Sequence, residues 1–211
     1  MERVLQKRVI PVVVIEKAAH ALPLAEALLK AGQDVVEITF RTPAAPDAVR
    51  DIRRKFPQML VGAGTLLTVE QVDQAVSAGA MFGVSPGLNE KIVAKVHAAK
   101  LPMIPGVMTA SEIEKAIELG CKYLKFFPAE LAGGVKMIQA FWGPYSHTGI
   151  KFIPLGGITQ STMAAYLALP GVAAIGGSWM VDKKLIAAQD WTQIETLSRE
   201  ALATAAAVRK T

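Results

Sequence analysis

The amino-acid sequence predicts a single parallel (β/α)8 barrel, the TIM-barrel architecture, in one domain over residues 1–211 with a short N-terminal helix. Strand-like and helix-like segments alternate from end to end and give eight strand-then-helix units. The connections are short and no linker interrupts them, so 211 residues suit one domain better than two. A doubly wound open sheet is the alternative. Gly62 and Gly64 resemble the start of a dinucleotide fingerprint, but Leu67 occupies the position of its third glycine.

Short apolar runs bounded by turn residues mark the expected strands. The eight strands cover residues 9–15, 34–40, 59–63, 80–85, 102–104, 121–127, 151–155 and 172–175. Pro128 ends the sixth strand, because proline has no N–H to donate to a sheet. No apolar run is long enough to cross a bilayer.

Helix-terminating and helix-capping residues place the helices between these strands. We expect helices over residues 17–31, 44–55, 68–78, 89–99, 109–119, 134–141 and 159–169, and helix from the eighth strand to the end. Gly32 ends the first of them, and Thr159 is the expected N-cap of the seventh. Thr68 and Thr109 each stand three residues before a glutamine or glutamate, which is the capping-box signature.

Composition excludes several classes of protein. With 52% hydrophobic and 19% charged residues, the chain is not a disordered one. The net charge is +5, yet the only basic run, residues 53–55, ends a predicted helix, so we expect no nucleic-acid partner and no membrane. A modest positive excess suits small anionic substrates. His20, His97 and His147 have no metal-ligand spacing, so we expect no metal.

The compartment is inferred from the cysteine count and the N-terminus. One cysteine, Cys121, excludes an internal disulfide and suits a reducing cytoplasm. The first ten residues lack an apolar segment followed by a cleavage site, so we expect no signal peptide.

Lys125 lies in the middle of the sixth predicted strand. Alternation along that strand puts Tyr123, Lys125 and Phe127 on one face and Leu124 and Phe126 on the other. A lysine in a strand usually extends its amine to solvent. Here the strand ends of the rest of the barrel supply the other groups that a reactive lysine needs.

Two other strand ends carry charged and polar residues. On the second strand, alternation turns Glu37 inward and places Arg41 at the barrel mouth, where active sites of this architecture lie. Burial and the Arg41 cation would both lower the pKa of Lys125, so that its amine attacks a ketone as a Schiff-base nucleophile. Glu37 would move protons, and Arg41 would bind the carboxylate of a keto acid. Thr65 is a second carboxylate ligand or simply the start of a turn, and Glu37 could instead form a structural ion pair with Lys125.

Glycine pairs follow the last two predicted strands. Gly156-Gly157 follows the seventh, and Gly176-Gly177-Ser178 follows the eighth. Glycine lets backbone N–H groups approach an anion, and loops seven and eight are the usual phosphate site of such a barrel. The expected substrate is therefore a phosphorylated keto acid.

These residues belong to seven motifs that resemble one family between about residues 10 and 181. The motifs are VEITFRT (36–42), VGAGT (61–65), SPGL (85–88), IPGV (104–107), KFFPAE (125–130), GGI (156–158) and GGSW (176–179). In this order they resemble 2-keto-3-deoxy-6-phosphogluconate (KDPG) aldolase and 4-hydroxy-2-oxoglutarate (KHG) aldolase. The resemblance implies a metal-free class I aldolase, a cytoplasmic homotrimer of the Entner–Doudoroff pathway, which reversibly cleaves KDPG into pyruvate and glyceraldehyde 3-phosphate.

The resemblance also implies a role for each site residue. Lys125 forms the imine and Glu37 is the general acid and base, without any other cofactor. Arg41 and Thr65 hold the pyruvate carboxylate. The remaining residues contact other parts of the substrate: Pro86 and Phe127 line the pyruvyl pocket, and Gly156, Gly157, Gly176, Gly177 and Ser178 hold the phosphate.

One position departs from the family pattern. Family members commonly have threonine before GGI, and this chain has Leu155. A site that loses the side chain that hydrogen-bonds a substrate hydroxyl discriminates less between substrates with and without that hydroxyl. We therefore hypothesise that Leu155 favours less polar aldehydes. Sister aldolases for KHG, for the galactonate epimer or for unphosphorylated aldehydes stay open as alternatives. So do a phosphate-binding epimerase or isomerase that needs no imine, and a sensor that binds a sugar acid without turnover.

Overall fold

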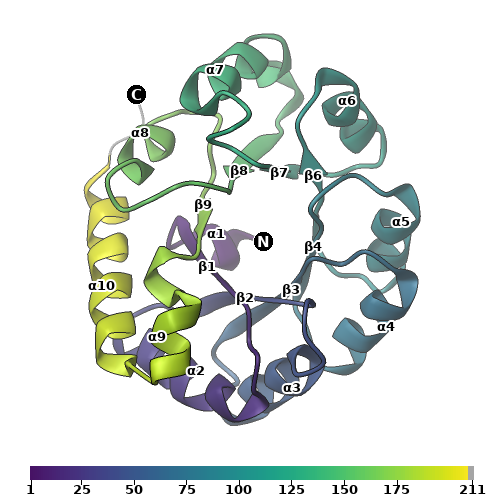
Figure 1. Cartoon of the computed structure of the whole chain (residues 1–211). Helices are drawn as coiled ribbons and strands as arrows, with labels where there is room; N and C mark the ends of the chain where they lie inside the picture. The colour runs from purple at the N-terminus through teal and green to yellow at the C-terminus, as the bar shows by residue number, and fades with distance from the viewer. Residues whose placement is uncertain (209–211) are drawn as a thin grey trace.

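The computed structural model describes residues 1–208, and its parallel strands form a ring with the helices outside it (Figure 1). The strands pair in the orders β5-β4-β3-β2-β1-β9 and β6-β7-β8. β5 and β6 are two parts of one barrel strand, separated by Pro105, and Phe152 in β8 forms a parallel bridge with Val172 just before β9. The predicted barrel is therefore confirmed, and the open-sheet alternative is wrong.

All strands are parallel, and each lies in or next to a predicted run. Their bounds are β1 (Val9–Val13), β2 (Val35–Thr39), β3 (Leu60–Gly64), β4 (Phe82–Val84), β5 (Met103–Ile104), β6 (Gly106–Val107), β7 (Tyr123–Phe126), β8 (Lys151–Pro154) and β9 (Ile175–Gly177).

The helices follow the strands in alternation and surround the ring. They are α1 (Glu2–Leu5), α2 (Ala21–Lys30), α3 (Ala45–Lys55), α4 (Val69–Ser77), α5 (Glu90–Ala98), α6 (Ala110–Glu118), α7 (Gly134–Tyr145), α8 (Met163–Leu167), α9 (Lys183–Ala188) and α10 (Trp191–Ala207), with 3-10 turns η1 (Ala18–His20), η2 (Ser146–Thr148) and η3 (Trp179–Val181). Both predicted capping boxes, at Thr68 and Thr109, are confirmed by reciprocal hydrogen bonds. Within residues 1–208, no helix is long and apolar enough to cross a membrane.

Two apolar layers follow from the alternation of side chains along the strands. The outer layer lies between strands and helices and contains Leu124 and Phe126 of β7 and Val36 and Ile38 of β2. The inner layer fills the barrel and is made by the apolar residues Val4, Ile10, Val35, Leu60, Phe82, Val84, Ile104, Ile153 and Ala174. Because the neighbours of Lys125 and Glu37 along the chain face outward, these two polar side chains face the interior.

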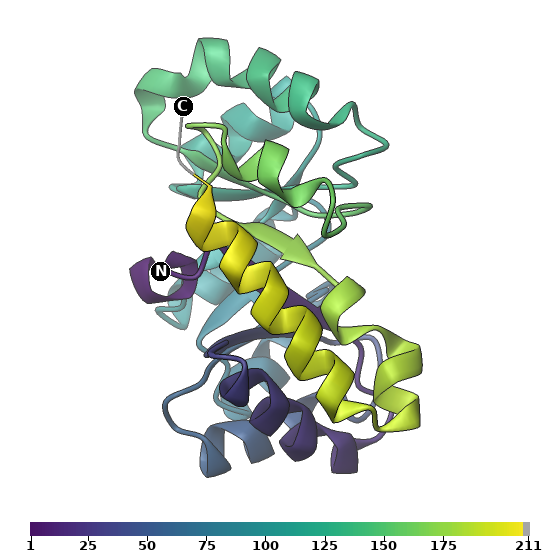
Figure 2. The same ribbon diagram turned by 90° about the vertical axis from the view of Figure 1, so that its left-hand side faces the viewer.

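Helix α1 covers the N-terminal end of the barrel. Val4 packs into the inner layer, with Met1 and Leu5 against it. Figure 2 shows α1 at the side of the molecule where β1 begins, on the opposite side from α9. The interior is therefore sealed at one end by α1 and opens at the carboxyl ends of the strands.

The eighth strand is displaced from its predicted place. We expected residues 172–175, followed by Gly176 and Gly177 in a loop, whereas both glycines lie within β9 and pair with Ile10 and Pro11 of β1. Side chains pack directly on them. A Cβ added to Gly176 would lie 2.3 Å from the Leu155 side chain, and a Cβ added to Gly177 would lie 1.8 Å from the Trp179 side chain. Glycine is a poor strand signal, so the sequence pattern places the strand on the apolar run before the two glycines.

Several predicted helix boundaries also need correction. Thr159 is not an N-cap: its hydroxyl contacts Ser161 and Thr162 in a turn, and α8 begins at Met163. Helix α7 continues past the predicted end at residue 141 to Tyr145, although Pro144 lies inside its last turn and has no N–H to donate to the helix. The C-terminal region is not one continuous helix.

Two side-chain caps divide that C-terminal region into separate helices. The carboxylate of Asp182 accepts a hydrogen bond from the Lys184 N–H at the start of α9. The carboxylate of Asp190 accepts one from the Gln193 N–H at the start of α10. Aspartate favours such N-caps, so each one begins a new helix.

Candidate active site

Lys125 and Glu37 lie at the centre of the candidate site. Each side chain is 2% exposed, and both line a small inner cavity with apolar residues of the strands. The Nζ of Lys125 lies 4.9 Å from the centre of the Phe127 ring. Each of the two groups shifts the pKa of the other. Within residues 1–208 they form no direct ion pair, so the structural ion pair between Glu37 and Lys125 is not observed.

A glycine on the neighbouring strand makes room for the Glu37 side chain. Gly64 pairs with Thr39 in the parallel ladder between β2 and β3. A Cβ on Gly64 would lie 1.9 Å from Glu37 Oε1. That oxygen is buried and makes no hydrogen bond within the described part of the chain, so it is free to exchange a proton with a bound molecule.

Burial shifts both side chains toward their neutral forms. It lowers the pKa of the Lys125 amine; Glu37 partly opposes this shift and Arg41 adds to it. Burial likewise raises the pKa of the Glu37 carboxyl, which Lys125 and Arg41 partly oppose. A neutral amine is a nucleophile, and a carboxyl with a raised pKa can both give and accept a proton near neutral pH.

Arg41 and Thr65 lie together where β2 and β3 end. The Nε of Arg41 donates a hydrogen bond of 3.1 Å to Thr65 Oγ1. Its two terminal nitrogens donate to no residue among 1–208, which leaves the guanidinium fork for a planar carboxylate. Thr65 has a φ of 58°, a left-handed conformation that costs a β-branched residue about 1–3 kcal/mol. Such strain is typical of functional sites.

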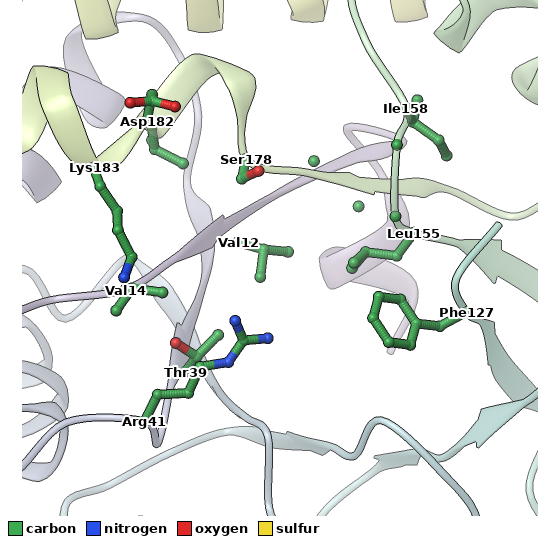
Figure 3. Close-up of a pocket in the computed structure, with 15 residues that line it drawn as sticks. Val12, Val14, Thr39, Arg41, Phe127, Leu155, Ile158, Ser178, Asp182 and Lys183 are labelled. Atoms are coloured by element: carbon green, nitrogen blue, oxygen red, sulfur yellow. The ribbon is translucent and has the colours of Figure 1, made fainter. Parts of the chain in front are cut away.

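A larger outer cavity of about 370 Å3 opens at the same end of the barrel (Figure 3). In Figure 3 the Arg41 guanidinium points into it from one side, and Phe127 and Leu155 face it from the other. Both glycine pairs and Ser178 also line it. The predicted carboxylate ligand and the predicted phosphate ligands therefore share one cavity.

Leu155 lies at the boundary between the outer and the inner cavity. Leu155 and Gly176 are the two residues that line both of them. The Leu155 side chain covers the Cα of Gly176 so closely that an added Cβ would be 2.3 Å from its Cδ1. A molecule that reaches from Lys125 to the glycine pairs must pass an apolar surface there.

Pro86, like Thr65, is a predicted site residue that lines neither of these two cavities. Pro86 follows β4, and a Cβ added to Gly106 would lie 2.0 Å from the Pro86 carbonyl oxygen. Its role in a pyruvyl pocket stays a prediction.

Other lining residues were not predicted. They are Val12, Val14, Thr39, Ile158, Val181, Asp182 and Lys183. Of these, Lys183 carries a positive charge and contacts Glu16 at 3.4 Å. Its place just after GGSW, beyond the last strand, is the signal that could have identified it.

Comparison with known proteins gives a family match and a close relative. The family model described as "Aldolase: KDPG and KHG aldolase" matches residues 1–197. The 2-dehydro-3-deoxy-phosphogluconate aldolase of Treponema pallidum is 49% identical over 202 residues, which cover 96% of this chain and 94% of that protein.

Two solved structures are similar over nearly the whole chain. The KDPG aldolase of Legionella pneumophila, which holds pyruvate as a covalent carbinolamine, has a TM-score of 0.88 and is 41% identical, covering 92% of this chain and 93% of that one. The aldolase of Zymomonas mobilis ZM4, solved with 3-phosphoglycerate, has a TM-score of 0.88 and is 36% identical, covering 100% and 98%.

The electrostatic arrangement predicts opposite effects of two substitutions on Lys125. We expect Arg41→Met to raise the pKa of Lys125, because it removes a cation that disfavours the ammonium. We expect Glu37→Gln to lower that pKa, because it removes the acidic group that partly opposes the effect of burial on Lys125. The 13Cε chemical shift of Lys125, followed against pH, measures both.

A remote cation provides the control for this titration. Arg50→Met removes an exposed guanidinium that contacts Asp47 on α3, and it should leave the Lys125 titration unchanged. If Arg41→Met and Glu37→Gln moved the titration in the same direction, the electrostatic account would be wrong.

Proposed function

Because this chain belongs to the KDPG and KHG aldolase family and is a class I aldolase, we propose that Lys125 forms the imine through which it cleaves KDPG. The observation that carries the proposal is the buried Lys125 amine and the buried Glu37 carboxyl in one inner cavity, which meets the outer cavity lined by Arg41 at Leu155 and Gly176. The products are pyruvate and glyceraldehyde 3-phosphate, and the reaction is reversible.

Substrate binding uses the two ends of the outer cavity. The free guanidinium nitrogens of Arg41, with the Thr65 hydroxyl, hold the substrate carboxylate so that its neighbouring ketone faces Lys125. The backbone N–H groups of the two glycine pairs and the Ser178 hydroxyl hold the phosphate. Holding both ends orients the reacting carbon atoms, which is a large part of catalysis by an enzyme.

The neutral amine of Lys125 then attacks the ketone carbon C2. A C–N bond forms, the carbonyl π electrons move to oxygen, and that oxygen takes a proton from Glu37. The carbinolamine loses water and becomes a protonated imine. A relative from Legionella pneumophila holds pyruvate as this kind of carbinolamine, which supports the step.

Cleavage follows from the protonated imine. Glu37, now a carboxylate, removes the proton from the C4 hydroxyl, and the C3–C4 bond breaks. The electron pair of that bond enters the imine, which gives an enamine, and glyceraldehyde 3-phosphate leaves. The enamine takes at C3 the proton that Glu37 removed from the C4 hydroxyl, and water hydrolyses the imine to release pyruvate and restore the Lys125 amine. The imine itself is the electron sink, so the proposed mechanism needs no metal and no other cofactor.

Leu155 supports a second proposal, which concerns the acceptor aldehyde. Because it presents an apolar surface between Lys125 and the phosphate ligands, we propose that it weakens the preference for polar, phosphorylated substrates. KHG, the galactonate epimer and unphosphorylated aldehydes are then the substrates to compare with KDPG.

We also propose that the chain is a homotrimer and acts in the cytoplasm, in the Entner–Doudoroff pathway. Exposed apolar side chains support assembly: Leu131 is 91% exposed and Met108 is 47% exposed. Phe141 and Trp142, by contrast, are partly buried and pack against the core. Analytical ultracentrifugation should find three times the mass of one chain, and the mass of one chain would refute the trimer.

Trapping the imine tests the main proposal. With pyruvate and sodium borohydride, we expect a reduced pyruvyl adduct on Lys125, located by peptide mass mapping. Lys125→Arg should give no adduct, because arginine stays protonated. Glu37→Gln should still form the adduct but turn over about 10²- to 10⁴-fold more slowly. The exposed Lys122 is the matched control, and Lys122→Arg should trap normally. An adduct that survives Lys125→Arg would overturn the assignment.

Restoring a hydroxyl at position 155 tests the specificity proposal. We expect Leu155→Thr to raise the ratio of kcat/KM for glyceraldehyde 3-phosphate to that for glyceraldehyde, in the reaction with pyruvate, by about tenfold, the value of one good hydrogen bond. Leu155→Val, which stays apolar, should not change that ratio. An unchanged ratio in Leu155→Thr would refute the idea.

A further inference from the structure

A side-chain hydrogen bond connects α8 with the loop that follows β7. The hydroxyl of Tyr166 donates to Glu130 Oε1 at 2.6 Å. Tyr166 is 1% exposed, and its burial, together with Glu130, raises the pKa of its hydroxyl, so it stays a donor at any ordinary pH. Glu130 is the last residue of the KFFPAE motif, and the proposed reaction gives it no role.

Glu130 packs directly on the first glycine pair. An added Cβ on Gly157 would lie 2.7 Å from Glu130 Cγ and 2.8 Å from its Cβ. The Glu130 N–H donates to the Gly156 carbonyl at 3.0 Å, and the Ala129 N–H donates to that of Leu155 at 2.9 Å. The chain from 155 to 157 is therefore held by two backbone hydrogen bonds and by the Glu130 side chain.

These contacts hold the backbone of two glycines, which could otherwise adopt other conformations. Gly156 and Gly157 have φ values of 105° and 82°, in the region that glycine occupies readily. Glycine populates many other conformations, so neighbouring groups must select this one. Gly134 leaves room for the arrangement: a Cβ there would lie 3.1 Å from the Tyr166 hydroxyl. Lys125, by contrast, is held by the β-ladder, where its N–H donates to the Pro105 carbonyl.

We propose that Glu130 and Tyr166 are positioning residues that hold Gly156 and Gly157 in the conformation that binds the substrate phosphate. The proposal rests on the proposed function, since it assumes that this glycine pair contacts the phosphate. Neither residue lines the outer or the inner cavity, so their effect passes through the glycine backbone. Loss of the hydrogen bond should weaken binding of the phosphorylated end and leave the chemistry at Lys125 intact.

Tyr166→Phe removes the hydrogen bond and keeps the buried ring. We expect KM for KDPG to rise about five- to tenfold with kcat nearly unchanged, as for the loss of one ordinary hydrogen bond. Exchange of the pyruvate methyl protons with deuterated water, followed by 1H NMR, needs Lys125 and Glu37 but no phosphate, and it should stay at the wild-type rate. KM for unphosphorylated 2-keto-3-deoxygluconate should also stay unchanged.

Two substitutions at position 130 extend the test. Glu130→Gln keeps an acceptor for the tyrosine and should bind KDPG nearly as the wild type does. Glu130→Ala removes both the acceptor and the contact with Gly157, and it should raise KM for KDPG as much as Tyr166→Phe or more. Because Glu130 is exposed, this variant provides the test even if Tyr166→Phe does not fold.

A second tyrosine–glutamate pair provides the matched control. The hydroxyl of Tyr145 on α7 donates to Glu114 Oε1 of α6 at 2.9 Å, and neither residue lines the outer or the inner cavity. Tyr145→Phe should leave KM for KDPG unchanged.

The proposal is overturned if Tyr166→Phe and Glu130→Ala leave KM for KDPG unchanged. It is also overturned if pyruvate exchange falls in parallel with KDPG cleavage, because that would indicate general loosening of the barrel. Failure of the wild-type protein to form an imine with pyruvate would instead refute the proposed function. The two failures are therefore distinguished by different experiments.

Discussion

The chemistry proposed for this protein depends on the removal of two ionisable groups from water. Lys125 and Glu37 are each almost fully buried in a barrel filled with aliphatic and aromatic side chains. Burial of charge is unfavourable, and replacing a buried ion pair by apolar residues is often neutral or stabilising for a protein. A lysine and a glutamate therefore persist in such a place at a cost to stability. What the desolvation provides is reactivity, because it moves the amine toward its neutral nucleophilic form and the carboxyl toward a proton-carrying form.

The barrel makes this arrangement possible because each strand places only alternate residues inside. Lys125 and Glu37 come from strands that are not neighbours, and each is flanked along its own strand by residues that pack outward against helices. The strands end at one rim, where Arg41 and Thr65 meet in a hydrogen bond. The strained backbone of Thr65 is tolerated there because the ladders of β2 and β3 hold the rim in place.

The other end of the site is made of backbone more than of side chains. Glycines at 156, 157, 176 and 177 bring main-chain atoms to the surface of the outer cavity, and three of them are covered closely by the side chains of Glu130, Leu155 and Trp179. A glycine site of this kind adapts easily and needs support. Two residues support the glycines in different ways: Leu155 covers Gly176 between the outer and the inner cavity, and Glu130 packs against Gly157.

The sequence by itself determined the number and order of the strand–helix units, because hydrophobic periodicity and capping boxes are local properties of the chain. It also determined that Lys125 and Glu37 face inward, since side chains alternate along a strand whatever its partner is. Only the tertiary structure decided that Gly176 and Gly177 belong to β9, that Leu155 lies over Gly176, and that Tyr166 reaches Glu130. These features depend on which distant segments pair and how closely their backbones approach, and no local pattern of residues carries that information.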